Sequence, residues 1–177
     1  MSIRLFVALD LPGAALRALE EFRDVAADPV VWRPLDASTF HVTLAFLGHR
    51  DDADVARCVA ALSAVPVVAP PLALGRALVL TRALAVGLAD PTGALGRLQA
   101  AVGGALARAG LYEPEGRPFR PHVTIGRLRK GARPPRRSAA ADPEPVAFTA
   151  GPVVLYRSLL GRGGATYEPL WTTLGPG

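Results

Sequence analysis

The sequence has few of the residues that form disulfides, zinc sites or membrane spans. Cys58 is the only cysteine among 177 residues, which excludes an internal disulfide framework and a multi-cysteine metal site and favours a reducing cytoplasm. Residues 59–75 form the longest apolar stretch, but three prolines interrupt it, so we do not expect it to span a membrane. The apolar run at residues 3–9 is too short for a signal peptide and predicts a first strand.

Lysine is also nearly absent, since Lys130 is the only one and arginine supplies the remaining basic charge. Lys and Arg together number 20 against 15 Asp and Glu, a formal net charge of +5 that favours polyanions as partners. Apolar residues make up 50% and charged residues 20% of the chain, as is typical of a folded globular protein. We expect one bilobed domain over residues 1–177.

A strand-helix-strand pattern occurs twice along the chain. Sliding the sequence by 79 residues superposes Val7 on Val86 and Pro12 on Pro91, among other matches. The repeat predicts an α+β fold with two pseudo-symmetric strand-helix-strand lobes, in which antiparallel sheets surround a central cleft. Each lobe is expected to carry a further strand. The predicted strands are residues 3–9, 40–47, 83–88, 121–128, 146–149, 153–156 and 166–174.

Turn and cap residues set the expected ends of these elements. Helices are predicted to begin at Pro12, after Asp51 and Asp52, and at the pair 90–91, and the last of them to end at Gly110. We expect turns at residues 33–34, 48–49 and 161–164.

Two near-identical tetrapeptides occupy matching positions of the repeat, His41-Val-Thr-Leu44 and His122-Val-Thr-Ile125. Alternate side chains of a strand share a face, so each histidine points the same way as its threonine, and the aliphatic residues pack into the core. A single His-x-Thr in a strand is common and usually has no function. Here, however, two of only three histidines fall in such motifs. We therefore expect the two histidines to face each other across the cleft.

Two facing imidazoles suit a reaction that removes one proton and delivers another near neutral pH. Phosphodiester hydrolysis has this need, because one histidine can take a proton from the attacking water while the other protonates the departing ribose oxygen. The hydroxyls of Thr43 and Thr124 would donate hydrogen bonds to the non-bridging phosphate oxygens. The residues alone leave open which histidine has which role.

Arg127 is a further candidate, because its guanidinium offers a planar set of donors to a phosphate. It follows His122 by five residues, so in a regular strand it would point to the opposite face. A bulge at Gly126, or the end of the strand, would bring it to the cleft. The segment from Arg127 to Arg137 is typical of a solvated basic loop, and its cations together would make an RNA-backbone contact.

Neither a metal nor a cofactor is expected. A metal site requires three or more converging ligands, and His49 is the only histidine outside the motifs. His49 follows Gly48 in an expected turn, which indicates a solvated loop residue. Cys58 lies on the apolar face of an expected helix and is not a candidate nucleophile.

The sequence resembles the two-histidine phosphoesterase superfamily, and within it the RNA 2′,3′-cyclic phosphodiesterases, also called 2′-5′ RNA ligases. The likeness covers most of the chain. It includes Arg4-Leu-Phe-Val-Ala-Leu-Asp-Leu-Pro12, Trp32 with Pro34 ahead of His41-Val-Thr-Leu-Ala-Phe-Leu-Gly48, then Pro121-His-Val-Thr-Ile-Gly-Arg127, and Leu155-Tyr-Arg-Ser158 with Gly164-Ala-Thr-Tyr-Glu-Pro-Leu170. That set is specific.

The resemblance implies a bilobed α+β fold and hydrolysis of a terminal RNA 2′,3′-cyclic phosphate to a 2′-phosphomonoester without metal. By the family's pattern, His41 is the proton donor to the 3′ oxygen and His122 is the proton acceptor from water. Thr43, Thr124 and Arg127 match the phosphate-binding positions. Weak, reversible 2′-5′ RNA joining is implied as a side activity. We expect a monomer in the cytoplasm whose partners are RNA ends or small cyclic nucleotides.

The resemblance also places Tyr156, Arg157 and Tyr167 near the cleft. Two alternatives stay open. The cleft of a non-catalytic binding module would hold a nucleotide or an RNA end without turnover. A third interpretation keeps the chemistry but changes the substrate to a nucleotide-sugar or a small cyclic nucleotide.

Overall fold

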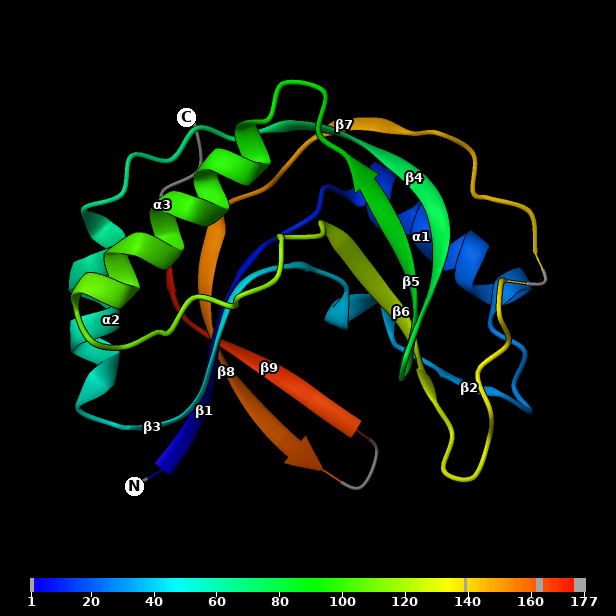
Figure 1. Ribbon diagram of the computed structural model, residues 1–177, viewed down its shortest axis with the longest axis horizontal. Coiled ribbons are helices and arrows are strands. Elements are labelled where there is room, and N and C mark those ends of the chain that lie inside the picture. Colours follow the sequence, from blue (N-terminus) through cyan, green and yellow to red (C-terminus); the bar gives the residue numbers. More distant parts are fainter. Residues whose placement is uncertain (1, 139, 162–163, 174–177) are drawn as a thin grey trace.

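The computed structural model describes residues 2–138, 140–161 and 164–173 and has the predicted α+β architecture (Figure 1). Within these residues, one antiparallel sheet is accompanied by three α-helices and a short 3-10 helix. The strands are β1 Ser2–Leu9, β2 Trp32–Pro34, β3 Val42–Asp51, β4 Pro71–Leu80, β5 Ala83–Ala89, β6 His122–Leu128, β7 Ala147–Thr149, β8 Val153–Gly161 and β9 Gly164–Thr172. The helices are α1 Gly13–Ala26, η1 Ala37–Thr39, α2 Asp54–Ser63 and α3 Ala94–Arg108.

The sheet consists of two halves that meet at one point. Its strand order is β7-β4-β5-β6-β3-β1-β8-β9, with β2 added beside β6. Strands β3 and β6 are joined by a single residue pair, Val42 with Val123, whereas neighbouring strands within each half pair over longer registers. Each half is one lobe, so the strands that carry the two histidine motifs lie side by side at the junction.

The helices are exchanged between the lobes, which the repeat in the sequence does not predict. Helix α1 follows β1 in the chain but packs on β6 and β7, and α3 follows β5 but packs on β3 and α2. Figure 1 shows α2 and α3 together on one side of the molecule and α1 on the other, beside β4 to β6. Each half of the repeat therefore helps to bury both lobes.

The apolar stripes of α1 and α3 are the faces that pack on the sheet. In α1 the buried residues are Ala15, Leu19, Phe22 and Ala26. In α3 the buried residues are Leu95, Leu98, Val102, Gly103, Ala105 and Leu106. Residues at intervals of three or four share one face of a helix, so a single stripe covers the sheet.

Several boundaries differ from the expectations for local physical reasons. Gly48 does not end the second strand, since β3 continues to Asp51. Its φ of 71° is accommodated by an irregularity in the pairing of β3 with β1. The expected turn at residues 33–34 is the short edge strand β2, which pairs with β6. The further strand expected in one lobe is β4, at residues 71–80.

The predicted helix caps are also corrected. Helix α2 begins at Asp54 without a side-chain cap, not directly after Asp51 and Asp52. Helix α3 begins at Ala94 after Gly93, whose φ of 68° marks a turn, while an Asp90 carboxylate oxygen accepts a hydrogen bond from the amide of Gly96.

The predicted end of α3 is confirmed, since Gly110 has a φ of 70° just beyond Arg108. The three late strands are present as β7, β8 and β9. Leu174 and residues 162–163 of the predicted turn lie outside the described residues. None of the helices in the described segments has the length and apolar character needed to cross a membrane.

Because one face of α1 is buried and the other is exposed, two substitutions in this helix should differ strongly in their effect on the free energy of unfolding. Leu19 is fully buried, whereas Val25 is 74% exposed. Leu19→Ala should lower the free energy of unfolding by about 2–5 kcal/mol, because it leaves a cavity between α1 and the sheet. Val25→Ala should change it by less than about 0.5 kcal/mol. Urea denaturation of both variants measures the difference, and equal effects would contradict this packing.

Candidate active site

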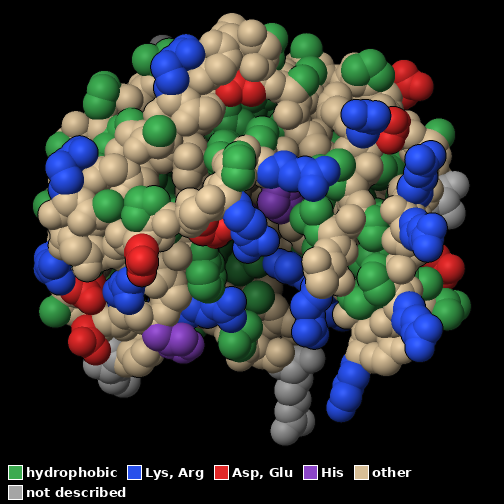
Figure 2. All heavy atoms as spheres, viewed as in Figure 1, with side chains coloured by type: hydrophobic (Ala, Val, Ile, Leu, Met, Phe, Trp, Pro, Cys, Tyr) green, Lys and Arg blue, Asp and Glu red, His purple; other side chains and the backbone are tan. Residues whose placement is uncertain are grey.

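The five site residues predicted from the sequence line one cavity of about 810 Å³ between the lobes. They are His41, Thr43, His122, Thr124 and Arg127. In Figure 2, arginine and lysine side chains gather around a hollow near the middle of this face. The cavity is therefore an electropositive cleft of a size that suits a nucleotide-sized anion.

The two motifs reach the cleft from the junction of β3 and β6. His41 directly precedes β3, and His122 is the first residue of β6. Val42 and Val123, the pair that joins the strands, are both fully buried. The predicted alternation is confirmed, because the histidines and threonines line the cleft while the residues between them pack into the core.

Both histidines have the same backbone anchor. The Nδ1 atom of His41 lies 2.7 Å from the carbonyl oxygen of Thr39, and that of His122 lies 2.7 Å from the carbonyl oxygen of Arg120. A carbonyl oxygen only accepts, so Nδ1 carries the proton in each neutral ring and Nε2 has the free lone pair. In His41 this Nε2 lies 3.1 Å from Oγ1 of Thr43, whose hydroxyl donates to it. The anchor fixes both the orientation and the tautomer of each ring.

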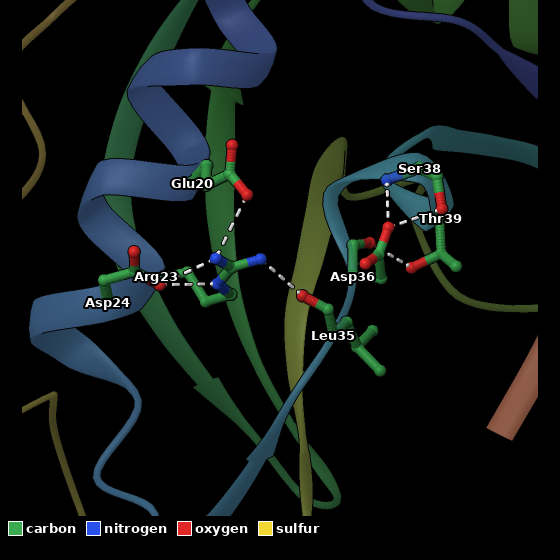
Figure 3. Close-up of polar contacts among 7 residues, drawn as sticks. All are labelled: Glu20, Arg23, Asp24, Leu35, Asp36, Ser38 and Thr39. Carbon is green, nitrogen blue, oxygen red and sulfur yellow. Dashed lines mark hydrogen bonds and ion pairs between the residues drawn. The ribbon is translucent and has the colours of Figure 1, made fainter. Parts of the chain in front are cut away.

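The carbonyl that anchors His41 belongs to a segment held by its own polar network (Figure 3). Asp36 caps helix η1: its Oδ1 accepts from the amide of Ser38 at 2.9 Å and from the Ser38 hydroxyl. These two hydrogen bonds lower the pKa of Asp36. Arg23 of α1 donates to the carbonyl of Leu35 at 2.8 Å. Helix α1 and the Asp36 cap thus fix the backbone that positions His41.

The His41 ring is half-buried among aromatic side chains. It lies 4.9 Å from the ring of Phe6 and 5.2 Å from that of Tyr167, which meets it edge-on. Burial lowers the pKa of His41 to about 4, and the positive charges of Arg127 and His122 act in the same direction, against the opposing effect of the Thr39 carbonyl. This environment therefore favours the neutral form of His41 near pH 7.

Tyr156 lies behind this aromatic group. Its ring stacks on Phe6 at 5.3 Å, and its hydroxyl donates to Asp10 at 2.7 Å. Burial and the Asp10 hydrogen bond raise the pKa of Tyr156, so its hydroxyl stays protonated. Of the residues that the resemblance places near the cleft, Tyr167 lines the cavity. Tyr156 lines a smaller pocket beside it, together with His41 and Tyr167. Arg157 lines neither of these pockets.

Arg127 reaches the cleft because β6 has a bulge. The pairing with β5 skips Ile125, whose carbonyl instead accepts a hydrogen bond from the amide of Leu35 at 2.9 Å. The extra residue reverses the alternation of side chains, so Arg127 lines the same cavity as Thr124. Of the two expected explanations, the bulge is the one observed. It lies one residue before Gly126, and the strand continues past Arg127.

Sequence analysis did not single out three cationic residues that also line the cavity, Arg4, Arg23 and Arg33. Arg4 precedes Phe6 by two residues on β1, so strand alternation contains the signal that would have found it. Arg33 lies on β2, a segment for which the sequence predicted only a turn. Its Nη1 lies 2.8 Å from the position that a Cβ would take at Gly164, so it reaches the start of β9.

The remaining candidates lie outside the cleft. His49 is an exposed residue of β3, not of a turn, and its Nδ1 lies 3.2 Å from the Ser2 hydroxyl. Cys58 is buried in α2, and burial raises the pKa of its thiol. Across the part of the chain that the structure describes, no three His, Cys, Asp or Glu side chains are grouped to hold a metal ion.

Comparison with known proteins gives consistent matches over nearly the whole chain. Residues 11–162 match the model of the 2'-5' RNA ligase superfamily. The RNA 2',3'-cyclic phosphodiesterase of Escherichia coli (strain K12) is 29% identical over 173 residues, which cover 94% of this chain and 93% of that protein.

Solved structures share the fold. The crystal structure of E. coli LigT complexed with 3'-AMP superposes with a TM-score of 0.83 at 27% identity, covering 97% of this chain and 98% of that one. The crystal structure of TT0787 of Thermus thermophilus superposes with a TM-score of 0.77 at 24% identity, covering 96% of both chains.

The environment of His41 predicts how this residue titrates. By ¹H–¹⁵N NMR of the imidazole nitrogens, His41 of the free protein should titrate with a midpoint near pH 4. Inorganic phosphate should raise that midpoint, because an anion in the cleft favours the charged imidazolium. The spectrum of the His41→Asn variant assigns the resonance. A midpoint near the ordinary histidine pKa of about 6.5 in the free protein, or one that phosphate leaves unmoved, would contradict this view of the site.

Proposed function

The chain belongs to the 2'-5' RNA ligase superfamily, and from this premise we propose that it hydrolyses a terminal RNA 2′,3′-cyclic phosphate to a 2′-phosphomonoester. One observation carries the proposal. Two imidazoles with the same backbone anchor line one electropositive cavity together with both threonines and Arg127. The relative that is named an RNA 2',3'-cyclic phosphodiesterase, and the LigT structure that holds 3'-AMP, support a nucleotide substrate.

In the proposed reaction, the two histidines move one proton each. The Nε2 of His122 takes a proton from water, whose oxygen attacks phosphorus. The bond from phosphorus to the 3′ oxygen breaks, and the Nε2 of His41 delivers a proton to that oxygen. The products are a 2′-phosphomonoester and a 3′-hydroxyl. A 5′-hydroxyl of a second RNA in place of water would give a 2′-5′ phosphodiester, which accounts for weak, reversible joining.

His41 can act as an acid only if binding of the substrate causes its imidazole to take up a proton. By itself His41 is neutral near pH 7, since its pKa is about 4. A bound anionic phosphate offsets the positive charge of Arg127 and favours the imidazolium, so the substrate itself supplies the condition for an acid at this position. The tautomer fixed by Thr39 leaves Nε2 as the atom that receives and then donates this proton.

Thr43, Thr124 and Arg127 are proposed to bind the phosphate. The hydroxyls of the threonines and the planar guanidinium would donate to the non-bridging oxygens, which carry the developing negative charge. Thr43 changes partner in this step, since in the structure its hydroxyl donates to Nε2 of His41. We further propose that one bilobed domain, acting as a cytoplasmic monomer without metal or cofactor, performs the reaction.

Removal of either catalytic histidine should abolish most of the activity without unfolding the protein. With a 2′,3′-cyclic nucleotide in excess chelator, His41→Ala and His122→Ala should each lower kcat/KM by roughly 10²–10⁴-fold. His49→Ala is the matched control, because this exposed histidine lies outside the cavity. Circular dichroism checks the fold of each variant. Nucleotide binding without turnover by the wild-type protein would instead support the binding-module alternative.

Removal of the positive charge of Arg127 should lower kcat/KM, whereas removal of a positive charge outside the cleft should not. Arg127→Gln should lower kcat/KM on a 2′,3′-cyclic mononucleotide by on the order of 10²-fold, since a donor to the phosphate is lost. Arg133→Gln removes the same charge from an exposed loop residue and should change kcat/KM by less than about twofold. Equal losses in both variants would mean that Arg127 acts only through the general field of the protein.

A further inference from the structure

The positive charge of the protein is concentrated in one segment of the chain. Residues 116–138 contain eight of the 20 Lys and Arg residues and none of the 15 Asp and Glu residues. The rest of the chain has 12 cations against 15 anions, so this segment accounts for the whole surplus of +5. A surplus that is confined to one segment makes a local positive surface, which attracts anions to that place.

Five of these cations belong to the loop that follows β6, residues 129–137, which we call the basic loop. Its cations are all exposed: Arg129, Lys130, Arg133, Arg136 and Arg137. Among the residues that the structure describes, none of the five forms an ion pair, whereas Arg23, Arg57 and Arg157 each lie beside a carboxylate. The protein itself therefore does not neutralise the charge of the basic loop.

Contacts near both ends of the basic loop tie it to the body of the protein. The Nε of Arg129 donates to the carbonyl of Pro29 at 2.6 Å, and the Arg129 amide donates to the carbonyl of Val31 at 3.0 Å. Beyond the loop, the carboxylate of Asp142 accepts from the amide of Ala77 on β4 at 2.9 Å. The loop is thus held beside the strands of one lobe, and its cations stay near the end of β6.

The positive surface reaches from the basic loop into the cleft. On β6, Arg127 is paired with Arg33 on β2, and both residues line the cavity. Like charges directly opposite each other on paired strands repel, and an anion in the cavity would reduce that repulsion. The basic loop is the yellow segment after β6 in Figure 1, and in the same view Figure 2 shows arginine and lysine side chains from the hollow to the edge of this half of the molecule.

We propose that the basic loop binds the phosphate backbone of the RNA strand that leads into the cleft. A 2′,3′-cyclic phosphate is the 3′ end of its strand, so only the 5′ part of the RNA leaves the cavity. Each linkage of that part carries a negative charge, which the exposed cations can neutralise. Contacts of this kind position a strand without reading its bases. The inference rests on the proposed function and deepens it, because it makes an oligonucleotide the preferred substrate.

Continuity with the cleft favours RNA over an anionic membrane as the partner of this surface. Arg127 and Arg33 belong to the same positive surface but line a cavity. The flat surface of a bilayer does not enter such a cavity, whereas the end of a single strand does. An RNA strand can therefore contact the cations of the cavity and of the basic loop at once.

The test compares a long substrate with a short one. The long substrate is an oligouridylate of about eight nucleotides that ends in a 2′,3′-cyclic phosphate. The short substrate is uridine 2′,3′-cyclic phosphate, which ends within the cleft. The triple variant Arg133→Gln, Arg136→Gln and Arg137→Gln removes three charges that lie outside the cavity. It should raise KM for the long substrate about tenfold at low salt but leave kcat/KM for the short substrate within about twofold of wild type.

Binding of the long RNA should also depend on salt through the basic loop. Fluorescence anisotropy with an oligouridylate that ends in a 2′-phosphate measures binding without turnover. The logarithm of the association constant should fall with the logarithm of the salt concentration. In the triple variant the slope should be shallower by about 2, because each lost phosphate contact removes roughly 0.7.

A second triple variant is the matched control, with the substitutions Arg57→Gln, Arg97→Gln and Arg108→Gln. It removes the same charge from exposed residues of α2 and α3, which lie on the other side of the molecule from β6 (Figure 1). It should change KM for the long substrate by less than about twofold, because salt screens distant charges. Circular dichroism checks the fold of both variants.

Three results would each overturn the inference. These are a loss in the control variant as large as that in the loop variant, an equal loss of the loop variant on both substrates, and no loss on either. Cosedimentation with vesicles of phosphatidylserine and phosphatidylcholine tests the membrane as partner. Binding to vesicles that depends on the loop, together with no such dependence for the oligonucleotide, would also overturn it.

The binding measurement separates this inference from the proposed activity. If the wild-type protein hydrolyses neither substrate but binds the long RNA through the basic loop, the RNA-binding surface stands and the proposed reaction fails. If the wild-type protein hydrolyses both substrates and the loop variant binds the long RNA equally well, the reaction stands and the RNA-binding surface is wrong.

Discussion

The whole cleft depends on one residue pair, Val42 with Val123, which is the only point at which β3 and β6 are paired. Both valines are fully buried, so the hydrophobic core holds the two lobes together directly beneath the site. An antiparallel register centred on this pair directs each histidine toward the threonine of the other motif. The strands diverge on either side of the pair, and that divergence opens the cavity around the four polar side chains.

Bulges in β3 and β6 direct side chains into the cleft that would point away from it in regular strands. The skipped residues Ile125 and Leu44 reverse the alternation of side chains in β6 and β3, so Arg127 and Phe46 both emerge beside the cavity. A regular strand would have placed an arginine in the core, at a large cost in desolvation. Each lobe thus directs three side chains into the cleft: a histidine, a threonine and a third residue. The third residue is Arg127 in one lobe and Phe46 in the other.

The sequence predicted the parts of this design that follow from local periodicity. The period of two in His41-Val-Thr-Leu44 and in His122-Val-Thr-Ile125 predicted which side chains share the cleft. Long-range relations could not be predicted in this way. Sequence periodicity does not show that α1 packs on the other lobe, that β3 continues past Gly48, or that Arg33 belongs to a strand paired with β6. Even the bulge at Ile125 depends on a long-range contact, in which its carbonyl accepts from the amide of Leu35.

The electrostatics of the cleft oppose the protonation of His41 that its proposed role as an acid requires. Arg127 and His122 both disfavour a charge on His41, and its aromatic neighbours remove water from the ring. The same cations attract an anion, and an anion in the cleft offsets their effect on His41. Because proton uptake and anion binding are linked, each favours the other by the same free energy. Binding of a phosphate would therefore raise the pKa of His41, which is the condition that its proposed role as an acid requires.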